Sequence, residues 1–201
     1  MIKILLADDQ ALVRGALSAL LNLEPDLEVV AEVGSGDLVV DAAIEHRPDV
    51  ALLDVEMPGM DGISAAAALR GVLPEVKVLI VTTFGRPGFL RRALQAGASG
   101  FVVKDTPAAE LADAVRRVHA GLRVVDPALA ADSLVAGESP LSPRETEVLR
   151  AASDGSTAAG IAAKLFLSEG TVRNHLSGAI GKTGAATRAE AVLIATDNGW
   201  L

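Results

Sequence analysis

Five short apolar segments, separated by segments of helical periodicity, dominate the first part of this 201-residue chain. The apolar segments are residues 3–7, 28–33, 50–53, 77–82 and 101–104, and the helical segments are residues 11–23, 38–45, 62–72, 87–96 and 108–120. One helical segment, residues 11–23, carries a stripe of apolar residues spaced three or four apart: Leu12, Ala16, Leu20 and Leu23. Strands that alternate with helices predict an α/β fold, a doubly wound five-stranded parallel sheet with helices on both faces.

The charge and the pattern of the chain both change near residue 140. Residues 1–138 hold 12 Lys and Arg against 20 Asp and Glu, whereas residues 139–201 hold six of each. The later residues also lack any strand pattern, which predicts an all-α domain. We therefore expect two domains, residues 1–122 and 141–201, joined by a linker over residues 123–140. A neutral second domain would attract DNA only modestly, because most non-specific affinity comes from phosphate neutralisation.

The composition limits where the chain can act. It contains no cysteine, which excludes disulfides and thiolate metal sites and fits a reducing cytoplasm. No signal segment opens the chain and no apolar run is long enough to span a bilayer. We therefore expect a cytoplasmic protein with no membrane insertion.

Polar side chains follow or end four of the five predicted strands. Asp8 and Asp9 follow the first, Asp54 ends the third, Thr82 ends the fourth and Lys104 ends the fifth. Parallel strands end at one edge of their sheet, so these side chains should meet there. Three clustered carboxylates repel one another unless a cation lies among them, and their oxygens suit Mg²⁺. Asp54 would then be a nucleophile able to form an aspartyl-phosphate.

This set of residues, with Met57-Pro58-Gly59 after Asp54, resembles the receiver domain of bacterial two-component response regulators, which has a flavodoxin-like fold. The resemblance implies that Asp54 accepts a phosphoryl group from a sensor histidine kinase. The residues that it assigns to Mg²⁺ are Asp8, Asp9, Asp54 and Glu56, the last through its backbone carbonyl. It assigns Thr82 and Lys104 to contacts with the phosphoryl oxygens. It assigns Thr82 and Phe101 to the conformational switch. A plain core position is the alternative for Phe101.

The last part of the chain has the pattern of four helices. Ser142-Pro-Arg-Glu145 is a capping box with proline at the first helical position, which marks a helix start. Three further helices are predicted over residues 157–165, 172–182 and 187–195, with residues 168–171 as a tight connection. A helix, a short turn and a helix with an exposed polar stripe is typical of a helix-turn-helix.

Residues 141–201 resemble the LuxR-type helix-turn-helix of the NarL/FixJ family of response regulators, through motifs such as residues 165–177. In the predicted third helix, an apolar face is formed by Val172, Leu176, Ala179 and Ile180. The resemblance implies that double-stranded DNA is contacted by Thr171, Arg173, Asn174, Ser177 and Lys182. Arg and Asn side chains suit bidentate contacts with guanine and adenine, and Thr171 and Lys182 are expected at phosphates.

The second domain also departs from the family pattern. Gly160 stands where the family usually has Glu, and Gly181 where Arg is common. Gly178 interrupts the predicted reading helix, and each interior glycine costs about 1 kcal/mol relative to alanine. These departures suggest weak DNA binding by a single copy. A narrower branch of the family, the desaturase regulators, is resembled by residues 82–89, residues 21–24 and the terminal Gly199-Trp200.

The sequence thus predicts a non-enzymatic response regulator that is phosphorylated on Asp54, forms a homodimer and binds DNA to regulate transcription. One alternative is a DNA-binding regulator that works without phosphorylation. The other is a phosphatase that uses an aspartyl-phosphate. The phosphatase motif requires a second Asp two residues after the nucleophile, and Glu56 stands there.

Overall fold

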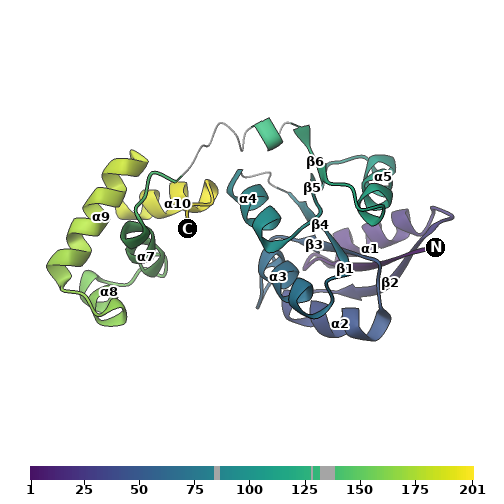
Figure 1. Cartoon of the computed structure of the whole chain (residues 1–201), viewed down its shortest axis with the longest axis horizontal. Coiled ribbons are helices and arrows are strands. Elements are labelled where there is room, and N and C mark those ends of the chain that lie inside the picture. The colour runs from purple at the N-terminus through teal and green to yellow at the C-terminus, as the bar shows by residue number, and fades with distance from the viewer. Residues whose placement is uncertain (84–86, 128, 132–138) are drawn as a thin grey trace. The chain divides into compact units, whose positions relative to one another are not determined.

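The computed structural model describes residues 1–83, 87–127, 129–131 and 139–201, and the chain divides into two compact units (Figure 1). The first unit contains a parallel sheet with helices, and the second is built of helices. None of the helices in these ranges is long and apolar enough to cross a membrane. Residues 128 and 132–138 of the predicted linker, and residues 84–86 of the segment that resembles the desaturase regulators, lie outside the described residues.

The first unit is a doubly wound α/β fold. Its sheet has the strand order β2-β1-β3-β4-β5-β6, and all neighbouring strands are parallel. The strands are β1 (Ile2–Ala7), β2 (Leu27–Val33), β3 (Val50–Asp54), β4 (Lys77–Thr82), β5 (Gly100–Val103) and β6 (Val124–Val125). The helices are α1 (Ala11–Leu21), the short 3-10 helix η1 (Gly36–Leu38), α2 (Val39–His46), α3 (Gly62–Val72), α4 (Pro87–Ala96) and α5 (Ala108–His119).

The sheet has one strand more than the five that the sequence predicts. Strand β6 is two residues long and pairs with β5, Gly100 opposite Val124 and Phe101 opposite Val125. Two residues are too few to show the periodicity by which strands are recognised in a sequence. The five predicted strands all form, and the central one, β3, is buried along its whole length.

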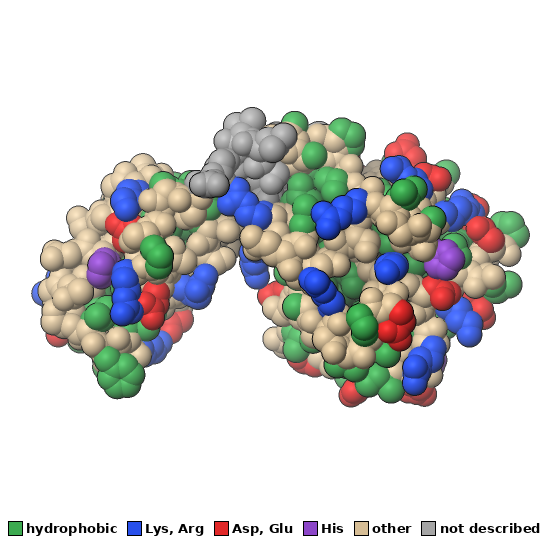
Figure 2. Space-filling model, viewed as in Figure 1, with side chains coloured by type: hydrophobic (Ala, Val, Ile, Leu, Met, Phe, Trp, Pro, Cys, Tyr) green, Lys and Arg blue, Asp and Glu red, His purple; other side chains and the backbone are tan. Residues whose placement is uncertain are grey.

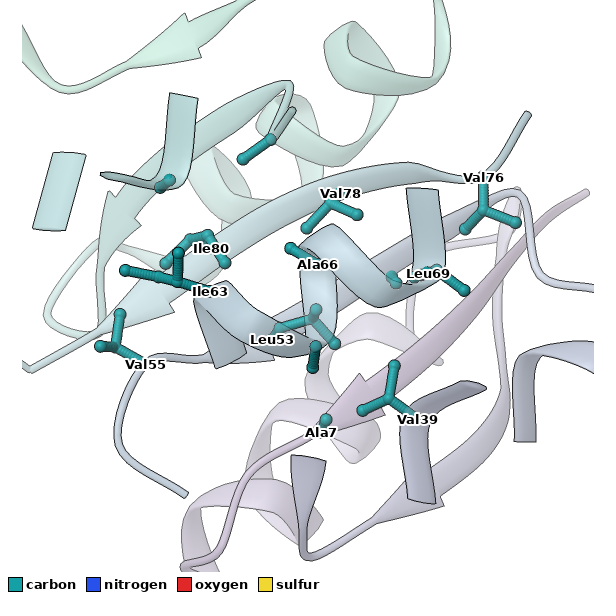
Figure 3. Close-up of a cluster of buried hydrophobic side chains, with 14 of the residues drawn as sticks. Ala7, Val39, Leu53, Val55, Ile63, Ala66, Leu69, Val76, Val78 and Ile80 are labelled. Atoms are coloured by element: carbon teal, nitrogen blue, oxygen red, sulfur yellow. The ribbon is translucent and has the colours of Figure 1, made fainter. Parts of the chain in front are cut away.

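Two apolar cores cover the two faces of this sheet, because successive side chains of a strand point to opposite faces. Leu53 and Ile80 pack on one face with Ala66 and Leu69 of α3 (Figure 3). Their neighbours Leu52 and Leu79 pack on the other face, with side chains of α1 and α5. Burial on both faces explains why the central strands are continuously apolar.

Helix α1 forms as predicted, but its apolar stripe does not face the core. Leu12 is 86% exposed and Leu23, just beyond the helix, is 78% exposed, while Ala16 and Leu20 are also exposed. The helix instead buries Ser18 and Leu21 against the sheet, next to the partly buried Leu17. A helical period fits either set of residues, so the sequence alone could not select the buried face.

The second unit consists of α7 (Pro143–Ala151), α8 (Ala158–Leu165), α9 (Glu169–Thr183) and α10 (Arg188–Asp197) around one apolar core. The capping box at the start of α7 is confirmed. The Ser142 side chain accepts a hydrogen bond from the Glu145 backbone, and the Glu145 side chain accepts one from the Ser142 backbone. The predicted apolar face of α9 is also confirmed, because Val172, Leu176 and Ala179 are buried and Ile180 packs against them.

Helix α9 begins three residues earlier than the sequence predicts. The Ser168 side chain accepts a hydrogen bond from the Thr171 backbone and so caps a helix that starts at Glu169. Residues 169–171, predicted as part of the connection, are therefore its first turn. The connection between α8 and α9 is residues 166–168, with Phe166 in the left-handed conformation at φ 55°.

Two glycines of α3 provide a test of how tightly this helix joins the sheet. A Cβ at Gly62 would lie 1.8 Å from the backbone oxygen of Asp54, whereas one at Gly71 would meet nothing within 4 Å. Gly62→Ala should therefore lower the free energy of unfolding by about 1–3 kcal/mol. Gly71→Ala should raise it by about 0.5–1 kcal/mol, because alanine is the better helix former. Chemical denaturation followed by circular dichroism measures both, and equal effects would contradict the close approach at Gly62.

Candidate functional site

The carboxyl ends of β1, β3 and β5 converge on one ammonium group. Lys104 follows β5, and its Nζ lies 2.7 Å from Oδ2 of Asp8 and 2.8 Å from Oδ2 of Asp54. All three side chains are nearly inaccessible, with exposed fractions of 9%, 2% and 4%. The Lys104 backbone also donates a hydrogen bond to the carbonyl of Thr82, which ties this position to β4. The structure therefore brings the side chains of Asp8, Asp54 and Lys104 together and joins this position to β4 through the backbone of Thr82.

Burial and charge act in opposite directions on this cluster. Burial raises the pKa of Asp54, and the hydrogen bond and positive charge of Lys104 oppose that effect. Burial works to lower the pKa of Lys104, but its hydrogen bonds to Asp54 and Asp8 outweigh burial and raise the pKa. A charged lysine between two carboxylates compensates part of their mutual repulsion. The nucleophile candidate Asp54 is thus held close to a cation in a poorly hydrated site.

The predicted metal ligands form a compact oxygen cluster. Carboxylate oxygens of Asp8, Asp9 and Asp54 all lie within 4.8 Å of one another, and Asp9 is exposed to solvent. Hard oxygen donors with one side open to water match the coordination that Mg²⁺ prefers, so the residues present fit this ion. Glu56 is exposed two residues beyond Asp54, and the metal role of its backbone carbonyl stays a prediction.

Two neighbours that the sequence reasoning missed hold Asp8 in place. The Gln10 backbone donates a hydrogen bond of 2.9 Å to Asp8 Oδ1. An Nη of Arg14 donates a hydrogen bond of 2.6 Å to the Asp8 carbonyl, and Arg14 also lies 3.8 Å from Glu32. Arg14 follows Asp8 by six residues on α1, a spacing that carries no recognised signal in a sequence.

The two predicted switch residues are both buried. Thr82 ends β4 with only 1% of its surface exposed. Phe101 on β5 is fully buried in the core on the side of α3 and α4, opposite Ile80 in the register of the sheet. This burial fits both the core position and the switch role that the sequence left open for Phe101. A switching role for either residue stays a prediction.

A cavity of about 470 Å³ opens beside the acidic cluster. Asp9 and Glu56 line it from the strand ends, and Phe89 and Arg92 line it from α4. Arg92 lies 3.7 Å from Asp61, the residue that caps α3. A small phosphorylated molecule or a phosphorylated side chain could therefore approach the cluster from this side.

The predicted DNA-reading residues lie on the exposed face of α9. Arg173, Asn174 and Ser177 are all exposed. Arg173 donates a hydrogen bond of 2.6 Å to Glu169, one helical turn earlier. Sequence reasoning missed Glu169, although its four-residue spacing from Arg173 is a readable signal for an ion pair. The pair holds the guanidinium against the first turn of the helix.

The two predicted phosphate contacts have partners within the helical unit. Thr171 shares a hydrogen bond of 2.8 Å with Ser168 at the start of α9. Lys182 Nζ donates a hydrogen bond of 2.7 Å to Glu145 of α7. On the face seen in Figure 2, Lys and Arg side chains of this unit are interspersed with Asp and Glu. This mixture matches the zero net charge of residues 139–201.

Comparison with protein families assigns both units. Residues 4–116 match the response regulator receiver domain, and residues 139–195 match the bacterial regulatory proteins of the luxR family. The chain therefore belongs to the two-component response regulators that combine a receiver with a LuxR-type DNA-binding domain. The class that the sequence predicted is confirmed.

Individual relatives resemble the chain over nearly its whole length. It is 42% identical to the transcriptional regulatory protein DesR of Bacillus subtilis, over all of this chain and 99% of DesR. It is 38% identical to the DNA-binding transcriptional activator DevR/DosR of Mycobacterium tuberculosis, covering 98% of this chain and 95% of that protein. The crystal structure of ChrA, the response regulator of a heme-sensing two-component system, matches with 34% identity and a TM-score of 0.61, covering 100% and 98% of the chains. These relatives are transcriptional regulators or response regulators, not enzymes.

The Glu145 carboxylate should make the stability of the helical unit depend on pH. Hydrogen bonds from Lys182 and from Ser142 outweigh burial and lower the pKa of Glu145 from 4.5 to about 2. A carboxylate with a lowered folded-state pKa stabilises the fold above its unfolded pKa, and this contribution is lost as the pH falls. The free energy of unfolding should therefore decrease between about pH 5 and about pH 2. Glu145→Gln should reduce that decrease.

The fluorescence of Trp200, the chain's single tryptophan, measures this effect because Trp200 packs against the core of the helical unit. Glu147→Gln, a change of a half-exposed residue two positions away on α7, is the matched control and should keep the dependence. An identical pH dependence in Glu145→Gln and the wild type would contradict the assignment.

Proposed function

We propose that the chain is a cytoplasmic regulator that a sensor histidine kinase phosphorylates on Asp54. The phosphorylated chain forms a homodimer and binds paired half-sites on double-stranded DNA, which changes transcription. The observation that carries the proposal is the convergence of Asp8, Asp54 and Lys104 at the edge of the sheet. The similarity to DevR/DosR, whose name includes DNA binding and transcriptional activation, supports the second step.

The phosphoryl transfer follows from the chemistry of the cluster. A carboxylate oxygen of Asp54 attacks the phosphorus of a phosphohistidine, a P–O bond forms and the P–N bond breaks. The ring nitrogen that leaves takes up a proton from water to give neutral imidazole, and Asp54 becomes a mixed anhydride. Lys104 bridges Asp54 and Asp8, and its ammonium group would interact with the phosphoryl oxygens as negative charge develops on them. The Thr82 hydroxyl, at the end of the next strand, is the candidate donor to another of these oxygens.

The acidic residues of the cluster would hold Mg²⁺ in this step. Asp8, Asp9 and Asp54 supply the carboxylates, and the carbonyl of Glu56 is the further ligand that we propose. Bound there, the ion supplies charge compensation for phosphoryl oxygens next to carboxylates. The chain itself excludes water from Asp54, which keeps the reacting oxygen poorly solvated.

Dimerisation would raise the affinity of the chain for DNA. A neutral DNA-binding domain has little electrostatic affinity, so a second linked copy raises the effective concentration at the neighbouring half-site. Leu12 and Leu20 on α1 and Leu23 just beyond it are exposed, which supports a protein contact on the receiver, because exposed apolar surface commonly marks such contacts.

The phosphorylation step has a direct test. Asp54→Asn should abolish the mass increase of a phosphoryl group after incubation with acetyl phosphate and Mg²⁺, because the nucleophile is lost. Asp41→Asn, an exposed change on α2, is the control and should be labelled like the wild type. Full labelling of Asp54→Asn would refute the assignment. Rapid release of phosphate without accumulation of phosphoprotein would instead favour the phosphatase alternative, and an absence of labelling in the wild type would favour the phosphorylation-independent one.

The DNA step is tested with a binding site selected from random DNA. Arg173→Ala should weaken binding by about 1–3 kcal/mol per half-site and relax the preference at one base pair, because a bidentate contact to guanine is lost. Arg150→Ala, an exposed arginine of α7, should leave the base preference unchanged. Titrations against selected and random DNA decide the result. If Arg173→Ala weakened both equally, Arg173 would contact phosphate and the proposed base readout would fail.

A further inference from the structure

Glu145 is a buried acid at the junction of α7 and α9. Only 10% of its side chain is exposed. Its Oε2 accepts a hydrogen bond of 2.7 Å from the Ser142 backbone and another of 2.7 Å from Lys182 Nζ. One carboxylate therefore closes the first turn of α7 and also ties α7 to the last turn of α9, 37 residues away along the chain.

The other oxygen of Glu145 explains a glycine in the reading helix. A Cβ at Gly178 would lie 2.6 Å from Glu145 Oε1, so an alanine there would force the carboxylate or the helix to move. Gly178 and Lys182 are four residues apart and share one side of α9. By contrast, a Cβ at Gly181 on the same helix would meet nothing within 4 Å. Gly178 thus leaves room for the Glu145 carboxylate beside α9 and is not merely a weak point in the helix.

The ion pair also changes what Lys182 can do for DNA binding. Its ammonium neutralises a buried carboxylate, and removing one partner of such a pair leaves the other without compensation. The same side chain is 44% exposed, so a phosphate contact and a structural role are both sterically open to it. The two roles predict opposite changes in DNA affinity when Glu145 loses its charge.

We propose that Glu145, Gly178 and Lys182 form a joint that fixes the orientation of α9 for DNA reading. In this joint Lys182 is a positioning residue, and it acts through Glu145 rather than through the phosphate backbone. The inference rests on the proposed DNA binding of this unit. Base contacts tolerate errors of only about 0.5 Å in side-chain placement. A shift of α9 against α7 therefore impairs the contacts of Arg173 and Asn174 before it impairs contacts to phosphate.

The decisive variant is Glu145→Gln in the full-length phosphorylated chain. If Lys182 contacted phosphate, removing the negative charge would release the lysine and tighten binding to every DNA. The joint predicts the reverse for a selected site: affinity falls about tenfold, while affinity for random DNA changes by less than about threefold. Lys182→Met should behave in the same way and leave the slope of log affinity against log salt unchanged. Lys182→Arg, which keeps the charge, should restore most of the specific affinity.

The two glycines supply a matched pair of controls. Gly178→Ala should lower the ratio of specific to random affinity, and Gly181→Ala should not. Equal loss of affinity for both DNAs in Lys182→Met, with the salt slope reduced by about one, would overturn the joint and assign Lys182 to phosphate.

A second measurement does not depend on DNA. The unfolding equilibrium, followed by Trp200 fluorescence, should show about tenfold coupling between Glu145→Gln and Lys182→Met in a double-mutant cycle. Additive effects on unfolding would overturn the joint even if no DNA site were found. Failure of the wild-type chain to bind any selected DNA, with the coupling present, would instead count against the proposed function alone.

Discussion

The receiver depends on the burial of two carboxylates beside one ammonium group. Taking Asp8 and Asp54 out of water is unfavourable, and Lys104 offsets part of that cost from the end of a third strand. The register of the parallel sheet makes the arrangement possible, because it brings the ends of β1, β3 and β5 to one edge. In the proposed phosphorylation, the contacts that stabilise this cluster would be exchanged for contacts to a phosphoryl group. The site and the stability of the fold are therefore coupled through the same three side chains.

Much of the receiver could be predicted because its signals are local or topological. Short apolar strands ending in polar residues predicted both the sheet and the meeting of Asp54 with Lys104. The buried face of α1 and the strand β6 could not be predicted. The stripe at Leu12 and the buried set at Leu21 fit the helical period equally well, so only packing against the sheet decides between them. Strand β6 forms because it can pair with the edge of β5, and a two-residue segment is too short for a sequence pattern to predict that pairing.

In the helical unit too, some features could be predicted from local sequence patterns and others depend on packing between helices. Its capping box and the apolar face of α9 were visible as local patterns, and so was the exposed face that carries Arg173. The pairing of Glu145 with Lys182 was not, because it joins residues 37 positions apart on different helices. Sequence reasoning interpreted Gly178 as a defect because helix propensity describes an isolated helix. In the folded unit, the Glu145 carboxylate lies so close to Gly178 that a larger side chain there would clash with it.

The close approach at Gly178 has a consequence for engineering. Reading helices are attractive units for transplantation between regulators, since exchanging one helix promises a new target sequence. A donor helix with a side chain at the position of Gly178 would displace the Glu145 carboxylate or the helix itself here, unless Glu145 were changed with it. Grafts onto this scaffold should therefore be designed as a helix together with its docking partner, and libraries should keep this one position invariant while the outward-facing positions vary.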